Sequence, residues 1–343
     1  MPKGGKMKAI LALEDGTIFE GKAFGAKGEV AGEAVFNTQV VGYQEILTDP
    51  SYRKQLIAMG YPHIGNYGIN ERCNESDKTH AAALIVKEAS KIYSNWQAKG
   101  SLSDFMSKNN VIGIEDIDTR ALVVHIRDNG EMRGVVSTKD FNKDSLVKKA
   151  KAYELPDLVS EIKTKRPQSP VSSPQFVIID IGVNNSVLKK FPKAAVVSYD
   201  TSADEIIKMA PKQVVISNGP GDPRKLSALI GEIKKLIEKV PVYGIQNGAC
   251  VLALALGCGV SRMKVGHHGV NHPVVHPKTG VGEISVQNHS YGIDKVPKNV
   301  KVAHVNLNDK TIEKIETKDG KCVGTLYYPI DERGKLDSGY KFV

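Results

Sequence analysis

The chain has 343 residues, of which 41% are hydrophobic and 25% are charged, a composition typical of folded globular domains. This length allows two domains with separate cores, and the composition excludes a disordered chain or a coiled coil as the description of the whole. The net charge of +9 comes from scattered lysines, with no basic run interleaved with aromatic residues. We therefore predict a solvated basic surface and no nucleic-acid partner.

The cysteines and the apolar segments both favour a cytoplasmic protein. Cys73, Cys250, Cys258 and Cys322 have no CxxC spacing, which predicts reduced thiols. The longest apolar stretch, Val251 to Val260, is much shorter than the ~20 residues that span a bilayer. The apolar run near the N-terminus is interrupted by acidic residues and is too short for a signal peptide. We therefore expect no membrane partner.

The first half of the chain begins with short strand-like segments separated by glycine turns, a pattern typical of antiparallel sheet. Further along, Asp118 is placed to cap a helix from Thr119 to Asp128, which ends before Asn129-Gly130. These elements predict a mixed α/β domain over residues 7–160.

A change of pattern separates this half from the next. The segment TKRPQSPVSSPQ contains three prolines and three serines without periodicity, which predicts a linker over residues 161–175. Short apolar runs then alternate with helical patterns, and Ser202 with Glu205 forms a predicted capping box. This repetition predicts a doubly wound parallel sheet over residues 176–343, with ligands bound at the carboxyl ends of its strands.

One turn in the second half has the pattern of a nucleophile elbow without a nucleophile. Residues Gly244 to Gly257 read GIQNGACVLALALG: a strand end, a tight turn bracketed by two glycines, and an apolar helix. In the pattern Gly-x-nucleophile-x-Gly, the glycines tolerate a sharp turn that pushes the middle side chain into a site. Here the middle residue is Gln246, whose amide neither ionises nor attacks carbonyls. We predict a scaffold that has lost its chemistry.

A second loop, SNGPGDP from Ser217 to Pro223, also follows a predicted strand. The backbone N–H groups around Gly219 and Gly221 are suited to contacts with a carboxylate or an oxyanion. Taken alone, Gly-Pro-Gly is more often simply a turn. Because both loops follow strands of one predicted sheet, we expect them to meet at one site.

Together these loops resemble the class I glutamine amidotransferase domain, and further segments resemble the small subunit of carbamoyl phosphate synthase. Those segments are EVAGEAVFNTQVVGYQEILTDPSYRKQ (29–55), YPHIGNYGIN (61–70), GIEDIDTRAL (113–122), MKVGHHGVNHPV (263–274) and QNHSYGID (287–294). They span nearly the whole chain in one order, which is far more specific than any single glycine motif. The resemblance implies a small-subunit N-terminal domain followed by an amidotransferase-like domain.

In this family the small subunit hydrolyses glutamine through a Cys-His-Glu triad and passes ammonia to a large subunit. The large subunit makes carbamoyl phosphate, for pyrimidine or arginine biosynthesis, from bicarbonate, ammonia and two ATP. Within the triad, the histidine-activated thiolate attacks the amide and the carboxylate orients the histidine. The resemblance therefore implies the large subunit of the synthase as partner, with ATP and Mg²⁺ bound there and no cofactor in this chain.

All three triad positions are changed in this sequence. Gln246 replaces the cysteine, and Tyr328-Pro329-Ile330 stands where the family has His-Pro-Glu, so Tyr328 and Ile330 replace the base and its orienter. Loss of a single triad member typically costs several orders of magnitude in rate. We therefore expect no glutaminase activity and a docking or regulatory role in an ammonia-using synthase.

The resemblance also implies a remnant of the glutamine-binding site, formed by Ser51, Gly219, Gly221, Asn288 and Tyr291. Around it, Asn247 replaces an apolar residue, and Cys250 replaces a glutamine. We expect this pocket either to bind glutamine or a related small ligand, or to have collapsed.

Two alternatives remain open. Cys250 lies one helical turn beyond Gln246, ~6 Å along the same face, and with a histidine of GHHGVNH as base it would make an active glutaminase. The other alternative is a free-standing protein that senses glutamine through Ser51 and the Gly219 loop. Structural histidines are the commoner reading of GHHGVNH. Because no carboxylate or cysteine stands at ligand spacing, we predict no metal site.

Overall fold

A computed structural model describes residues 7–162 and 174–328 and divides the chain into two compact units, Met1–Pro156 and Asp157–Val343. Most of the predicted linker, residues 161–175, lies outside the described residues. Val159 packs in the same core as Val177 and Ile179, so the short segment before the linker belongs to the second unit. Each unit has its own hydrophobic cores.

The first unit is a closed barrel with the strand order β1-β2-β8-β6-β4-β3-β9. Its strands are β1 Lys8–Leu13, β2 Ile18–Gly25, β3 Glu29–Asn37, β4 Gln55–Met59, β6 Ala83–Ile85, β8 Ile112–Glu115 and β9 Met132–Ser137, with a separate pair, β5 His63–Ile64 and β7 Glu88–Ala89. The β1–β2 hairpin is antiparallel, as expected. The pairs β3–β4, β4–β6 and β6–β8 are parallel, because the long segments between these strands permit crossover connections.

The helices of the first unit are α1 Tyr43–Thr48, α2 Leu102–Lys108, α3 Thr119–Asn129 and α4 Lys143–Ala152, with 3₁₀ turns at Pro50–Tyr52 and Glu71–Cys73. Helix α3 confirms the helix predicted from its capping signals. The Asp118 side chain accepts a hydrogen bond from Ala121 N–H at 2.9 Å, and Gly130 ends the helix with φ at 100°. Leu122 and Ile126 are buried in a core of the barrel.

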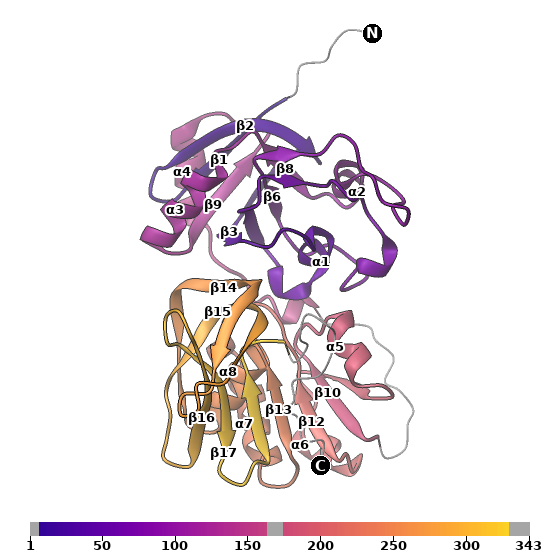
Figure 1. Cartoon of the computed structure of the whole chain (residues 1–343), viewed down its shortest axis with the longest axis vertical. Coiled ribbons are helices and arrows are strands. Elements are labelled where there is room, and N and C mark those ends of the chain that lie inside the picture. The colour runs from indigo at the N-terminus through magenta and orange to yellow at the C-terminus, as the bar shows by residue number, and fades with distance from the viewer. Residues whose placement is uncertain (1–6, 163–173, 329–343) are drawn as a thin grey trace. The chain divides into compact units, whose positions relative to one another are not determined.

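The second unit is one mixed sheet in the order β11-β10-β12-β13-β18-β17-β15-β14-β16. Its strands are β10 Phe176–Asp180, β11 Ala195–Ser198, β12 Gln213–Ile216, β13 Val242–Ile245, β14 Gly259–Val275, β15 Gly282–Lys295, β16 Val300–Asn306, β17 Ile312–Thr317 and β18 Cys322–Thr325. The five strands at one end of this order, β11, β10, β12, β13 and β18, are parallel to their neighbours among these five, as predicted. The remaining strands extend the sheet in antiparallel fashion; Figure 1 shows β16 and β17 in the same sheet as β10 and β12.

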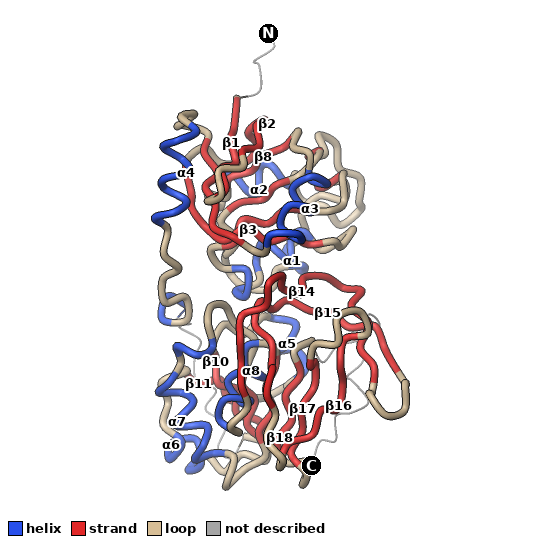
Figure 2. The backbone as a smooth tube through the Cα atoms, turned by 90° about the vertical axis from the view of Figure 1, so that its left-hand side faces the viewer, coloured by secondary structure: helices blue, strands red, loops and turns tan. Residues whose placement is uncertain are grey.

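Helices cover both faces of the parallel part of this sheet. They are α5 Asn185–Lys190, α6 Ala203–Lys208, α7 Ser227–Leu236 and α8 Asn247–Ala255, with 3₁₀ turns at Ser160–Ile162 and Pro223–Lys225. Alternate residues of β10 face opposite cores: Val177 packs with α6, α7 and α8, while Ile178 packs with α5. In Figure 2, α6 and α7 lie together along one side of the strands. Among the described helices of both units, none has the length and apolarity needed to cross a bilayer.

The predicted capping box is confirmed at the start of α6. The Ser202 hydroxyl accepts from the Glu205 N–H, and the Glu205 carboxylate accepts from the Ser202 N–H at 3.0 Å. This reciprocal pair satisfies two backbone donors that the first turn of a helix leaves free.

A buried histidine makes the stability of the first unit depend on pH. His80 Nε2 lies 3.0 Å from Ser76 Oγ, and Arg53 approaches Nδ1 at 3.5 Å. Burial, together with the charges of Arg53 and Lys78, lowers the pKa of His80 from 6.5 to about 3. As the pH falls, His80 therefore becomes protonated near pH 6.5 in the unfolded chain. In the folded chain it becomes protonated only near pH 3. The stability contributed by neutral His80 is complete above 6.5 and is lost as the pH falls.

We predict that His80→Gln, which cannot ionise, flattens the pH dependence of the free energy of unfolding between about pH 6.5 and pH 4. The slope removed is at most about 1.4 kcal/mol per pH unit, the value for one proton. Urea unfolding of the parent chain and of His80→Gln, between about pH 6.5 and pH 4, measures this slope. Equal slopes would contradict the assignment, whatever the absolute stability of the variant.

Candidate functional site

The strand-to-helix turn between β13 and α8 has the backbone of a nucleophile elbow. Gln246 occupies its apex with φ at 51° and ψ at −113°, a conformation that non-glycine residues adopt at a cost of about 1–3 kcal/mol and mostly at functional sites. Its N–H donates to Thr325 O on β18 at 2.7 Å, and its carbonyl accepts from the N–H groups of Ala249 and Cys250. The neighbouring strand and the helix N-terminus thus hold the turn from both sides.

The two glycines beside the apex are required by close backbone approach. A Cβ on Gly244 would lie 2.6 Å from Gly248 O, and a Cβ on Gly248 would lie 2.3 Å from Ile216 O on β12. The glycines therefore let the helix start directly against the strands, while the strained φ falls on Gln246 itself.

The Gln246 side chain is buried, with 1% of its surface exposed, and it hydrogen-bonds to neighbouring groups. In the amide orientation that matches donors to acceptors, its oxygen accepts from Asn288 N–H at 3.2 Å. Its nitrogen donates to Asn288 O and to Tyr328 Oη, both at 3.3 Å. Two of the predicted triad positions, Gln246 and Tyr328, therefore meet around Asn288. Ile330, the third, lies outside the described residues.

The loop that contains Gly219 and Gly221 is hydrogen-bonded to this elbow. The Asn247 side chain donates to Gly221 O at 2.9 Å. Gly221 has φ at 85°, which favours glycine, and a Cβ on Gly219 would lie 2.0 Å from Ile181 O. The two strand-end loops that the sequence pattern identified thus lie against each other at the carboxyl ends of β12 and β13.

Tyr291 lies in the same unit and is covered by a cation that the sequence reasoning missed. The guanidinium of Arg224 lies 5.4 Å from the centroid of the Tyr291 ring, and it also pairs with Asp222 at 2.7 Å. A cation over an aromatic face is a favourable contact. The only signal in the sequence was the position of Arg224 just after the glycine loop.

Cys250 is fully buried on α8, and its thiol donates to Tyr291 O at 3.8 Å. Burial, followed by the charges of Glu313 and Asp222, raises the pKa of Cys250 far above its usual range. A nucleophilic cysteine needs a lowered pKa and a neighbouring base. Here the thiol stays protonated and faces a carbonyl oxygen, which weighs against the relocated nucleophile.

Ser51 belongs to the first unit, on the 3₁₀ turn Pro50–Tyr52, where its N–H donates to Asp49 Oδ1 at 2.8 Å. The side chain is buried. Its predicted contact with glutamine stays a prediction.

A buried histidine cluster lies beside the pocket. His267 Nδ1 is 3.0 Å from Glu313 Oε1, and its Nε2 is 2.8 Å from Asp309 Oδ2. Burial alone would lower the pKa of His267, but the hydrogen bonds with Asp309 and Glu313 outweigh it and raise the pKa to about 9. Next to it, His268 Nδ1 bonds to Asn288 Oδ1 at 2.7 Å. These histidines thus have partners other than Cys250.

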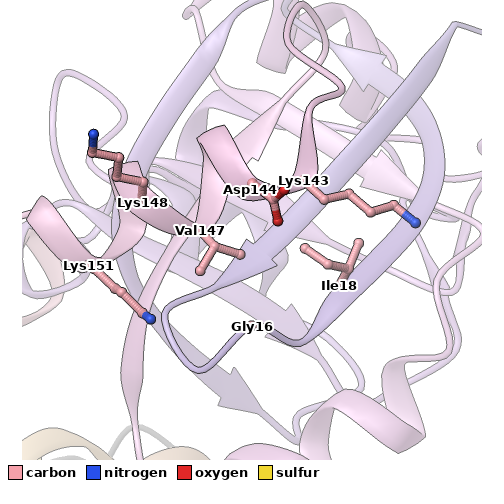
Figure 3. Close-up of a pocket in the computed structure, with 7 residues that line it drawn as sticks. All are labelled: Gly16, Ile18, Lys143, Asp144, Val147, Lys148 and Lys151. Carbon is pink, nitrogen blue, oxygen red and sulfur yellow. The ribbon is translucent and has the colours of Figure 1, made fainter.

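A hollow of 510 Å³ lies on the surface of the first unit (Figure 3). It is lined by Gly16, Ile18, Lys143, Asp144, Val147, Lys148 and Lys151. The lysines are exposed, and Lys143 already pairs with Glu20 at 2.7 Å. We assign no ligand to this hollow.

Two family models match the chain, one to each unit. The model described as carbamoyl-phosphate synthase small chain, CPSase domain, matches residues 11–136, and the model of glutamine amidotransferase class-I matches residues 177–329. Among solved structures, a glutamine amidotransferase from Thermotoga maritima superposes on 46% of this chain and 76% of that chain, with a TM-score of 0.35 and 17% identity.

Curated relatives match over nearly the full length. The carbamoyl phosphate synthase small chain of Aquifex aeolicus is 43% identical, covering 97% of this chain and 96% of the relative. The small chains of Syntrophotalea carbinolica and Clostridium perfringens are 42% and 39% identical, each over 98% of this chain and over 96% and 98% of the relative. The chain belongs to the family of carbamoyl phosphate synthase small chains, with a small-chain domain followed by a class I glutamine amidotransferase domain.

Proposed function

We propose that this chain is a small subunit of carbamoyl phosphate synthase that does not hydrolyse glutamine. It docks on the large subunit, tunes it, and leaves nitrogen to arrive as free ammonia, while ATP and Mg²⁺ bind on the large subunit. The observation that carries this proposal is Gln246. Its own amide occupies the elbow, bonded to the Asn288 backbone and to Tyr328 Oη.

The chemistry of these side chains supports the loss of hydrolysis. Thiol amidotransfer needs a nucleophile that attacks the amide carbon and a base that takes the proton of that nucleophile. A carboxamide is not a nucleophile at neutral pH, and the neutral phenol of Tyr328 exchanges hydrogen bonds without serving as a base. The nearest thiol, Cys250, is buried and protonated. These features weigh against the active-glutaminase alternative.

Exposed apolar side chains on the first unit support a docking role. Between β7 and α2, Ile92 is 81% exposed and Trp96 is 91% exposed. Exposed apolar side chains that lie together are a feature of interaction surfaces, and tryptophan is among the residues that contribute most to interfaces. We propose that this loop, residues 90–99, contacts the large subunit.

The synthase reaction tests the proposal directly. We predict that this chain, mixed with its cognate large subunit, changes the rate of carbamoyl phosphate formation from ammonium, and that glutamine supports less than about one hundredth of the ammonium rate. Phosphate-coupled or radiolabelled bicarbonate assays with each nitrogen source measure this. Equal rates with glutamine would contradict the proposal, and loss of that rate in Cys250→Ser would then support the relocated nucleophile.

Removing the Gln246 amide tests whether it fills the pocket. We predict that Gln246→Ala lowers the free energy of unfolding by about 1–3 kcal/mol, because the Asn288 backbone loses its partners in a buried site. The matched variant Gln246→Gly loses the same amide but relieves the positive φ, so it should be the more stable of the two.

Glutamine binding separates a filled pocket from an open one. Calorimetry should show no heat with glutamine for the parent chain, and glutamine should raise the melting temperature of Gln246→Ala more than glutamate does. Tight binding of glutamine by the parent would instead support the free-standing sensor.

Docking through the exposed loop is tested by Trp96→Ala. We predict that it weakens association with the large subunit by about tenfold or more, since truncating a buried interface tryptophan typically costs above 2 kcal/mol. Phe141→Ala is the matched control, because Phe141 is an aromatic of the same unit that is 41% exposed and contacts Lys8. Biolayer interferometry measures the affinity of the parent chain and of each variant for the large subunit. Equal affinities for all three would show that residues 90–99 are not part of the interface.

A further inference from the structure

We propose that the second unit carries a zinc-binding site formed by His267, His289 and Glu313. One ligand atom from each of these side chains lies within 4.8 Å of the others, and all three side chains are buried. The site is independent of glutamine hydrolysis, so it does not depend on the function proposed above.

The sheet brings the three residues together from adjacent strands. His267 on β14 and His289 on β15 are direct cross-strand partners, and Glu313 lies on β17, which is the other neighbour of β15. Directly opposite residues of an antiparallel pair have Cβ atoms about 4.5–5.5 Å apart on one face. Backbone pairing therefore sets the spacing of the ligands.

His267 is oriented as metal-ligating histidines usually are. Its Nε2 lies 2.8 Å from Asp309 Oδ2, which leaves Nδ1 to face Glu313 Oε1 at 3.0 Å. A carboxylate on the outer nitrogen fixes the ring orientation and strengthens the inner nitrogen as a ligand. Without metal, a proton on Nδ1 bridges the ring and Glu313; zinc would replace that proton.

His289 gives the stronger argument. Its Nδ1 lies 2.9 Å from Tyr291 O, and because a carbonyl oxygen only accepts, Nδ1 carries the proton. In the tautomer that carries its proton on Nδ1, Nε2 holds a lone pair. This buried atom has no hydrogen-bond partner and lies 3.5 Å from Glu313 Oε2, which is also buried without one. A cation between these two atoms, either a proton or a metal ion, would satisfy both of them.

The ligand set selects zinc among the common cations. Zinc binds imidazole and carboxylate at about 2.0–2.2 Å, which puts neighbouring ligand atoms of a tetrahedron about 3.4 Å apart. His267 Nδ1 lies 3.0 Å from Glu313 Oε1, and His289 Nε2 lies 3.5 Å from Glu313 Oε2, on either side of this value. One ligand atom from each residue lies within 4.8 Å of the others. Mg²⁺ and Ca²⁺ prefer oxygen ligands alone. A further imidazole is close: His272 stacks on His267 with ring centroids 5.0 Å apart, and its buried Nε2 lacks a partner.

The expectation of no metal rested on the lack of a carboxylate at ligand spacing. Glu313 supplies that carboxylate from a strand far along the chain, which sequence spacing does not reveal.

The test uses the full chain without an affinity tag, loaded with Zn²⁺ and dialysed. We expect metal analysis to find one zinc per chain. Glu313→Gln should lower zinc affinity by about tenfold or more, and Asp309→Asn, which leaves all three ligands in place, by about 10- to 100-fold. Glu316→Gln, a matched change on the same strand, should bind zinc as the parent does.

Cobalt in the parent chain keeps the proposal falsifiable even if a variant fails to fold. Co²⁺ held by imidazole and carboxylate gives visible absorption of a tetrahedral centre without a thiolate charge-transfer band. That spectrum, abolished by competing Zn²⁺, would support the site. No bound zinc or cobalt in the parent, a thiolate band, or unchanged affinity in folded Glu313→Gln would each overturn it.

Discussion

The backbone conformation at Gln246 is the constraint on which the rest of the pocket depends. With φ at 51° and ψ at −113°, the chain leaves β13 and enters α8 within one residue, and this aims the Gln246 side chain at Asn288. The turn is held by Thr325 O on one side and by the helix N-terminus on the other. None of these bonds involves the side chain, so a change of side chain at the apex does not by itself remove them.

That independence explains how the elbow accommodates a glutamine at its apex. The elbow's strain of about 1–3 kcal/mol is balanced by packing around Gly244 and Gly248, where backbones meet too closely for any Cβ. A buried amide at the apex needs both a hydrogen-bond donor and a hydrogen-bond acceptor. The Asn288 N–H provides the donor, and the Asn288 carbonyl provides the acceptor. Glutamine therefore fits this position with its amide hydrogen-bonded.

The sequence predicted those features that depend on local patterns. The capped helices α3 and α6, the parallel strands and the elbow follow from short-range signals: capping residues, apolar runs and paired glycines. The antiparallel extension of the sheet and the parallel pairs of the barrel depend on contacts between distant segments. For the same reason, Arg224 over Tyr291 and Glu313 beside His267 could not be predicted, since no periodicity links residues that meet only through the tertiary fold.

The pocket and the histidine cluster share strand β15, and this sharing bears on which residues can change. Asn288 holds Gln246 through its backbone, while the next residue, His289, faces Glu313. Glu313 is fully buried, so removing its imidazole partners would leave an uncompensated buried charge, which is strongly destabilising. The Gln246 amide is neutral and hydrogen-bonded, so it carries no such cost. Burial therefore constrains the charged network around Glu313 more strongly than it constrains the residue at position 246.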